Sequence, residues 1–337
     1  MMKQKQAGLS LIELMIALVL GLLITAVVVE IFINNQQMYR VQDARARMQE
    51  NGRYAINYIS DVIRQSAYMG CATRSSSIPT NNTLNNATDY LYDFSTPIQG
   101  FNAAASATWL PTIDGSIINP RSASDVFTVR GVQQPLIRVT AHPGSNPPGS
   151  ADIQVNAGNG LDRFDIVMVT DCLSAAIFQI TSANPNTSGS LTHNTGVGVP
   201  GNATKALGKD YTDAEIIRLS TRSLYISENA DAVPSLYQRI DGNAAQELVQ
   251  DVEEMQIVYG IDIGSDDAAD QYVTADNVVN WSEVISVKVS ILLRTGVDKL
   301  TVDGPQTYTF NGAVVVAADN RLRSVFTKTI TLRNRTP

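Results

Sequence analysis

An apolar run near the N-terminus, residues 9–29, is the feature that most constrains this chain. Only Ser10, Glu13, Gly21 and Thr25 interrupt it. At about 1.5 Å per residue, a helix of this length crosses the roughly 30 Å hydrocarbon core of a bilayer. The run therefore predicts one membrane-spanning helix, which we place at residues 9–32.

The charges around this run predict its orientation. Lys3 and Lys5 precede it, and the next basic residue is Arg40. Because positive residues stay on the cytoplasmic side, the N-terminus is expected in the cytoplasm and the rest of the chain outside it.

The small residues Ala7 and Gly8 lie before the apolar run, whereas a secretory signal peptide has its cleavage site after that run. Cleavage at this point removes a basic leader, residues 1–8, and leaves the hydrophobic helix on the mature protein.

The octet GLSLIELM, residues 8–15, resembles the type IV prepilin signal. This resemblance implies that a prepilin peptidase cleaves between Gly8 and Leu9 and that Leu9 becomes N-methylated. The chain departs mildly from the family pattern, because Leu9 stands where Phe is typical and Ser10 where Thr is commonest.

Glu13 stands where a carboxylate is costly, at least about 2.5 kcal/mol at membrane depth on insertion scales. In a chain that starts at Leu9, the terminal amine and Glu13 are four residues apart on one helix. The prepilin resemblance implies that this glutamate aligns an incoming subunit with the terminal amine of its neighbour. The alternative is a lone glutamate that reaches the cytoplasmic interface by snorkelling.

The helix is expected to continue as an amphipathic segment, residues 33–70. Apolar residues recur at helical spacing between charged and amide side chains, and no proline occurs before Pro79. The apolar positions are Val41, Ala44, Met48, Ala55, Ile59, Val62 and Ile63. We expect this stripe to pack against the protein's own sheet.

Residues 71–337 are predicted to form an exported, β-rich globular domain. Residues 72–124 are rich in turn residues and are expected to be irregular. Beyond this region, strand-like runs begin at residues 125, 163, 175, 215, 255, 282 and 323. A long helix followed by many strands predicts an α+β, pilin-like fold in which the helix covers one face of an antiparallel sheet.

Composition excludes some functions. The formal net charge is −7 and the pI is near 4.9, which argues against direct nucleic-acid binding. Cys71 and Cys172 have no metal-ligand spacing, and we expect them to pair outside the cytosol, closing a loop of about 100 residues. Two separate buried thiols are the alternative. The sequence gives no positive support for an enzyme.

The acidic stretch at residues 262–270 is a candidate calcium site, because Asp262, Asp266 and Asp270 recur every four residues in a loop that contains glycine. A solvated hairpin tip is the favoured alternative, since the EF-hand pattern is missing. A GxGxxG match at residues 196–201 lacks the flanking strand and helix of a dinucleotide site. No cofactor is otherwise predicted.

Three C-terminal segments, residues 247–262, 272–295 and 323–335, resemble the PilW-type minor pilins. This resemblance implies a minor pilin that primes type IV pilus assembly and sits at the tip, with motility, adhesion or DNA uptake as the supported process. Implied partners are the prepilin peptidase, other minor pilins, the major pilin and a tip adhesin. The implied location is the inner membrane with a periplasmic domain, then the pilus at the cell surface. Two alternatives are a type II secretion pseudopilin and a membrane-anchored periplasmic binding module.

Overall fold

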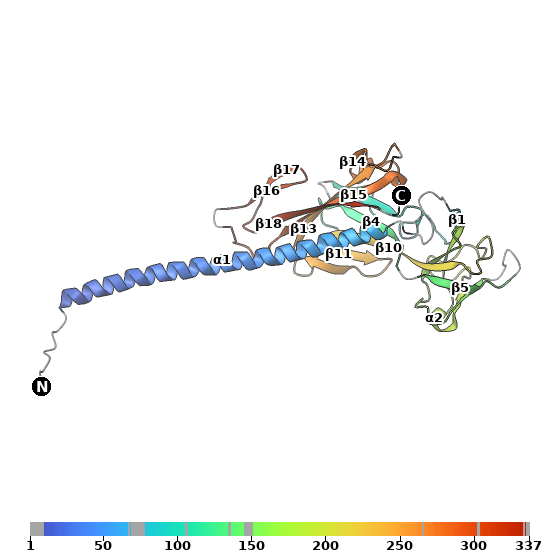
Figure 1. The fold of residues 1–337 in the computed structure, drawn as a ribbon, viewed down its shortest axis with the longest axis horizontal. Helices are drawn as coiled ribbons and strands as arrows, with labels where there is room; N and C mark the ends of the chain where they lie inside the picture. Colours follow the sequence, from blue (N-terminus) through green and yellow to red (C-terminus); the bar gives the residue numbers. More distant parts are fainter. Residues whose placement is uncertain are drawn as a thin grey trace, which may run out of the picture.

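A computed structural model describes residues 10–66, 68, 78–104, 107–133, 136–144, 151–264, 266–301, 304–332 and 334. One long helix, α1 (Leu11–Gln65), projects from a β-rich domain (Figure 1). The predicted end near Gly70 is wrong. Ser66 takes an extended conformation at ψ 152°, and its N–H and hydroxyl both donate to the carbonyl oxygen of Ile63. These bonds cap the helix one residue after Gln65.

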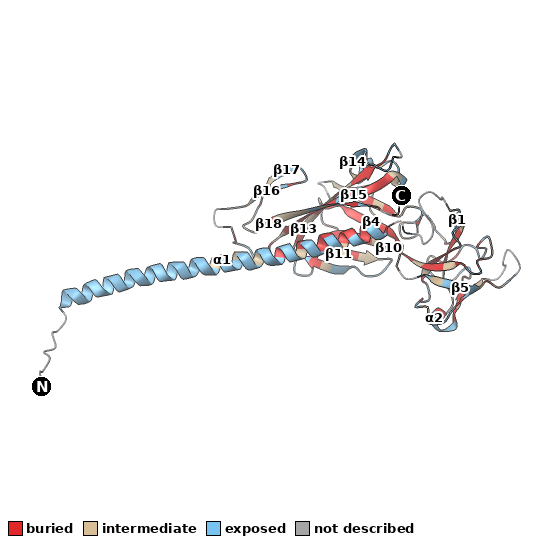
Figure 2. Cartoon of the chain, in the orientation of Figure 1, coloured by how far each residue is buried: buried red, intermediate tan, exposed pale blue. Residues whose placement is uncertain are grey.

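The two halves of α1 have opposite environments (Figure 2). Every residue from 10 to 36 is exposed, whereas the C-terminal half carries a buried stripe. The stripe consists of Met48, Gly52, Ala55, Ile56, Ile59, Ser60, Val62 and Ile63. The predicted amphipathic packing is therefore confirmed, although Val41 and Ala44 are only half-buried.

The described strands form three sheets, mostly antiparallel. The largest has 12 strands: β1 (Thr80–Asn82), β2 (Ile98–Ala104), β3 (Thr108–Leu110), β4 (Val126–Val132), β5 (Ile137–Ala141), β6 (Asp152–Val155), β7 (Ile166–Thr170), β8 (Ala175–Gln179), β9 (Ser190–Thr192), β10 (Glu215–Glu228), β11 (Pro234–Ile240) and β12 (Gln246–Gln250). Within it, β1 pairs with β8 in parallel.

A second sheet has the order β14-β13-β15-β18, formed by β13 (Val252–Ile261), β14 (Gln271–Val273), β15 (Val284–Arg294) and β18 (Arg323–Thr331). The third is the hairpin of β16 (Thr307–Phe310) and β17 (Ala313–Val316). The short helices are α2 (Pro185–Ser188), η1 (Ala275–Asn277) and η2 (Trp281–Glu283). Each of the seven strand-like runs of the sequence corresponds to a strand.

The expectation that residues 72–124 are irregular is wrong for β1, β2 and β3. Strand β2 contains Gly100 because Tyr259 of β13 lies against it. A Cβ at residue 100 would lie 1.9 Å from the Tyr259 hydroxyl oxygen. This close contact removes the apolar alternation by which a strand is recognised in a sequence.

Strand β10 connects two lobes of the domain. Its first residues, 215–219, pair with β7, whereas residues 219–224 pair with β4 and residues 222–228 pair with β11. The β7 side belongs to a distal lobe, defined here as residues 137–216, which has its own apolar core. The other side belongs to a helix-bound lobe, whose core joins α1 to strands of both large sheets.

Asp125, which precedes β4, holds the two large sheets together. Its carboxylate accepts hydrogen bonds of 2.8 Å from the N–H groups of Ala103 in β2 and Ile257 in β13. Its own N–H donates to the carbonyl oxygen of Met255. Burial raises the pKa of Asp125 to about 7, although both backbone donors favour the charged form.

Gly52 of α1 provides the first stability prediction. A Cβ at residue 52 would lie 2.3 to 2.7 Å from the ring of Phe326 in β18, so Gly52→Ala must displace that ring. We expect a loss of about 1–3 kcal/mol, despite the higher helix propensity of alanine. Urea unfolding of the full chain in detergent micelles measures it. Gly21→Ala is the matched control, because nothing lies within 4 Å of that Cβ. Equal stability of Gly52→Ala and the unsubstituted chain would contradict this packing.

His193 provides a pH prediction for the distal lobe. The imidazole is fully buried beside the Phe178 ring, at 4.8 Å between centroids, and burial lowers its pKa to about 4. Between pH 6.5 and 4 the unfolded chain binds a proton that the folded chain does not, so stability falls as pH decreases.

We expect His193→Gln, which cannot titrate, to lose roughly 2–3 kcal/mol less than the unsubstituted chain from pH 7 to 4. Asp125 acts with the opposite sign over the same range, so only the difference between the two proteins isolates His193. Denaturant unfolding at four pH values measures it, and parallel pH profiles would show the prediction to be wrong.

Candidate assembly site on the N-terminal helix

Ser10 and Glu13 form a reciprocal pair at the start of α1. The Glu13 N–H donates to the Ser10 hydroxyl oxygen at 3.2 Å, and the Ser10 N–H donates to Oε2 of Glu13 at 3.0 Å. Ser10 is the N-cap residue, with φ −73° and ψ 150°. This arrangement is a capping box, which satisfies two backbone N–H groups that a helix start otherwise leaves unpaired.

Glu13 is the only ionisable side chain from Ser10 to Val29. It lies in the first turn of α1, where the positive end of the helix dipole favours a negative charge. One of its oxygens accepts the Ser10 N–H, and the side chain is exposed. The carboxylate is therefore partly satisfied by its own chain and still accessible to another subunit.

Thr25 is the other hydrogen-bonding side chain in the interior of the apolar segment. Its hydroxyl donates to the carbonyl oxygen of Gly21 at 2.8 Å, one turn earlier. An internal hydrogen bond of this kind lowers the cost of a hydroxyl in hydrocarbon. Glu13 therefore remains the main polar group on this half of the helix that can interact with a neighbour.

The capping role of Ser10 was not among the predictions from the sequence, although the sequence contains a signal for it. Residues 10–13 read S-x-x-E before an apolar run, which is the capping-box pattern. The same residues also belong to the prepilin-like octet, and that resemblance directed attention to Glu13 alone.

The predicted processing residues Gly8 and Leu9 lie outside the described residues. Their roles in cleavage and N-methylation stay predictions. No cysteine among the described residues is free. Cys71 also lies outside the described residues, so its pairing with Cys172 stays a prediction as well.

The acidic stretch at residues 262–270 follows β13 and folds on itself. Asp262 is buried, and its two carboxylate oxygens accept hydrogen bonds from the N–H groups of Asp266 and Asp267. Asp270 accepts from the N–H groups of Ile263 and Gly264. These hydrogen bonds use the carboxylates of Asp262 and Asp270 to hold the loop. The described residues contain no group of three acidic, His or Cys side chains placed to hold a metal. Calcium binding here stays a prediction.

The glycine-rich loop at residues 196–201 packs against Gln179 of β8. The Gln179 amide donates to the carbonyl oxygen of Val199 at 2.8 Å and accepts from the N–H of Gly201 at 2.9 Å. These contacts give the loop a structural role within the distal lobe.

Two family models match the chain. Residues 3–29 match the prokaryotic N-terminal methylation motif. Residues 223–334, which run from the second half of β10 through β18, match type IV pilus-assembly protein W, PilW. No curated protein and no solved structure shows a significant match.

The exposed apolar helix, its methylation motif and the β-rich domain together support a type IV pilus-associated pilin. Within that class, the second match supports a PilW-like type IV pilin. The matched region covers the four-stranded sheet and its hairpin but not the distal lobe.

Ser10→Ala tests the capping box. Removing the hydroxyl leaves the Glu13 N–H without its acceptor, and we expect a loss of about 1 kcal/mol of local helix stability. Amide hydrogen exchange in micelles measures it, as faster exchange confined to the first turn of α1. Ser10→Thr is the control, because it keeps the hydroxyl. Unchanged exchange in Ser10→Ala would show that the box does not hold the helix start.

Proposed function

We propose that this protein is a minor pilin that primes assembly of a type IV pilus and is incorporated at its tip. The observation that carries the proposal is the division of α1. Residues 10–36 are entirely exposed, whereas the rest of the same helix is built into the domain core. An exposed apolar rod joined to a folded domain needs lipid or other apolar helices around it.

The proposed mechanism is transfer of this rod between two apolar surroundings. Before assembly the rod spans the inner membrane, with the domain in the periplasm. During assembly it leaves lipid and joins the helices of neighbouring pilins. Glu13 then pairs with the terminal amine of an adjacent subunit and sets the axial register, because buried charges need a partner.

The distal lobe supports the position at the tip. It lies beyond the C-terminal end of α1, at the end of the molecule farthest from the N-terminus (Figure 1). If the helices of successive subunits lie roughly parallel along the filament, this lobe occupies the space that the domain of a subunit above would need. A subunit of this shape fits best where no subunit stands above it.

The partners follow from this role. The methylation motif implies processing by a prepilin peptidase and association with other pilus components. We infer contacts with other minor pilins, the major pilin and, at the tip, an adhesin. A structural rather than an enzymatic role agrees with both matched families.

The test is incorporation of Glu13→Leu into pili. Cleavage depends on the residues around Gly8 and is expected to continue, whereas the variant lacks the charge that pairs with a neighbouring amine. We expect a mature N-terminus at Leu9 by mass spectrometry, with the subunit absent from sheared pili.

Two controls make this experiment specific. Glu30→Gln removes an exposed carboxylate from the same helix, beyond the main apolar run, and should be incorporated normally. Gly8→Val should retain the leader and also stay out of pili, which separates a processing defect from an assembly defect. Abundance of Glu13→Leu in sheared pili equal to the unsubstituted protein would reject the register role.

A further inference from the structure

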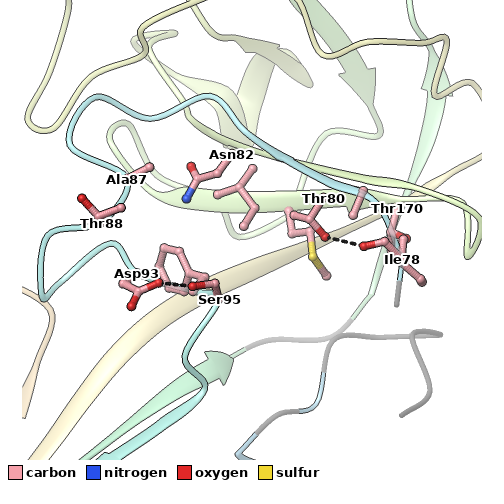
Figure 3. A pocket seen from close by; sticks show the side chains of 12 residues that line it. Ile78, Thr80, Asn82, Ala87, Thr88, Asp93, Ser95 and Thr170 are labelled. Atoms are coloured by element: carbon pink, nitrogen blue, oxygen red, sulfur yellow. Dashed lines mark hydrogen bonds between the residues drawn. The ribbon is translucent and has the colours of Figure 1, made fainter. Parts of the chain in front are cut away.

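A cavity of about 420 Å³ lies at the distal end of the domain, where β1, β7 and β8 meet the segment at residues 87–95 (Figure 3). This volume is typical of small-molecule sites. Its apolar lining is formed by Ile78, Phe94, Met168, Ala175 and Ile177. It extends from a buried apolar cluster that includes Phe94, Met168, Ala175 and Ile177.

Three hydroxyl groups of this cavity are left as hydrogen-bond acceptors, while Asn82 and Thr88, whose side chains can also donate, are the other uncharged polar residues of its lining. The hydroxyl of Thr80 donates to the carbonyl oxygen of Ile78 at 3.1 Å, and that of Thr170 donates to the carbonyl oxygen of Ser174 at 3.0 Å. The Ser95 hydroxyl donates to Oδ1 of Asp93. Because these hydroxyl protons are used within the protein, the oxygens they leave toward the cavity can accept but not donate.

Asp93 is the one charged side chain among the described residues that line the cavity. Its Oδ2 has no hydrogen-bond partner among the described residues. Arg130, which interacts electrostatically with Asp93, does not line the cavity, and it donates to the carbonyl oxygens of Tyr90 and Thr96. A ligand that enters therefore meets an unpaired carboxylate oxygen beside an apolar floor.

We propose that this cavity binds an amphiphilic monocation: an apolar body on the floor of Met168 and Ile177, and an ammonium group donating to Asp93. The apolar body gains from burial, and the ammonium gives the Asp93 carboxylate a charged donor, which none of the described lining residues supplies. A wholly apolar ligand would desolvate Asp93 without compensation. An anionic ligand would meet Asp93 with no basic side chain among the described lining residues to offset it.

This inference is independent of the assembly role. The cavity lies at the end of the domain opposite the exposed part of α1 (Figure 1), so it is not part of the surface that would pack in a filament core. In a subunit at the tip, this end would face the surroundings of the cell. Failure of the ligand experiment leaves the assembly proposal intact, and the reverse also holds.

The experiment compares two probes of the same shape, 2-phenylethylammonium and neutral 2-phenylethanol. The full chain, in detergent micelles with ¹³C-methyl methionine, is titrated at neutral pH, and free probe concentrations are set by dialysis against the same micelles. The reporter is the Met168 methyl resonance, assigned with Met168→Leu. We expect saturable shifts at this resonance, with the cation bound about tenfold more tightly than the alcohol.

Two substitutions separate charge from shape. Asp93→Asn should remove the preference for the cation while the alcohol binds as before, because the amide keeps an acceptor for Ser95. Asp89→Asn, an exposed carboxylate on the same segment outside the cavity lining, is the matched control and should leave the tenfold preference in place.

Ala87→Trp, at the edge of the cavity, should block both probes. Absence of a saturable shift for both probes, equal affinities of the two probes, or a preference that survives Asp93→Asn would each overturn the proposal.

Discussion

A single continuous helix with two incompatible surroundings is the constraint on which the rest of this structure depends. Residues 11–29 of α1 are almost entirely apolar and fully exposed, whereas the second half of the helix is apolar along one stripe, which is buried by the domain. Between them no proline interrupts the backbone ladder, so the halves move as one rod. Any change of surroundings for residues 10–36 must therefore reposition the whole domain.

The domain packs closely against the buried half of α1. Gly52 lets the Phe326 ring approach the helix backbone more closely than any other residue type would allow. The Asp125 carboxylate ties the 12-stranded sheet to the four-stranded sheet by accepting hydrogen bonds of 2.8 Å from backbone N–H groups of both. Strand β10 links the helix-bound lobe to the distal lobe, because it pairs with both β4 and β7.

The sequence predicted the parts of the fold that are determined by residues close together in the chain. Residues 9–29 show their apolarity directly, and alternation such as Val287, Val289 and Ile291 identifies a half-buried strand. Positions set by distant partners could not be found in this way. Gly100 breaks the pattern of β2 because Tyr259, far along the chain, needs the space. Gly52 looks like a weak point of a helix until the strand that packs on it is known.

The candidate sites show the same division. Glu13 stands out because its neighbours in the sequence are apolar, and Ser10 was recognisable from its spacing to Glu13. The distal cavity was not predictable, because Asp93 and Met168 are far apart in the sequence and line one cavity only in the folded chain. The spacing of these residues in the sequence does not indicate that they share a cavity. The acceptor character of the cavity hydroxyls also depends on hydrogen bonds that form only in the fold.

The transfer proposed for α1 also gives the Glu13 carboxylate a physical role in setting the axial register. Lipid tails and neighbouring helices are about equally apolar, so exchanging one for the other supplies little free energy that depends on axial position. Polar groups must then decide the register. Thr25 is satisfied by its own helix, whereas Glu13 is satisfied only in part, through the N–H of Ser10. A subunit shifted by one helical turn keeps most of its apolar contacts but separates Glu13 from the neighbouring amine by about 5.4 Å. In surroundings of low dielectric constant, this separation costs electrostatic free energy, which favours the register that keeps the two groups together.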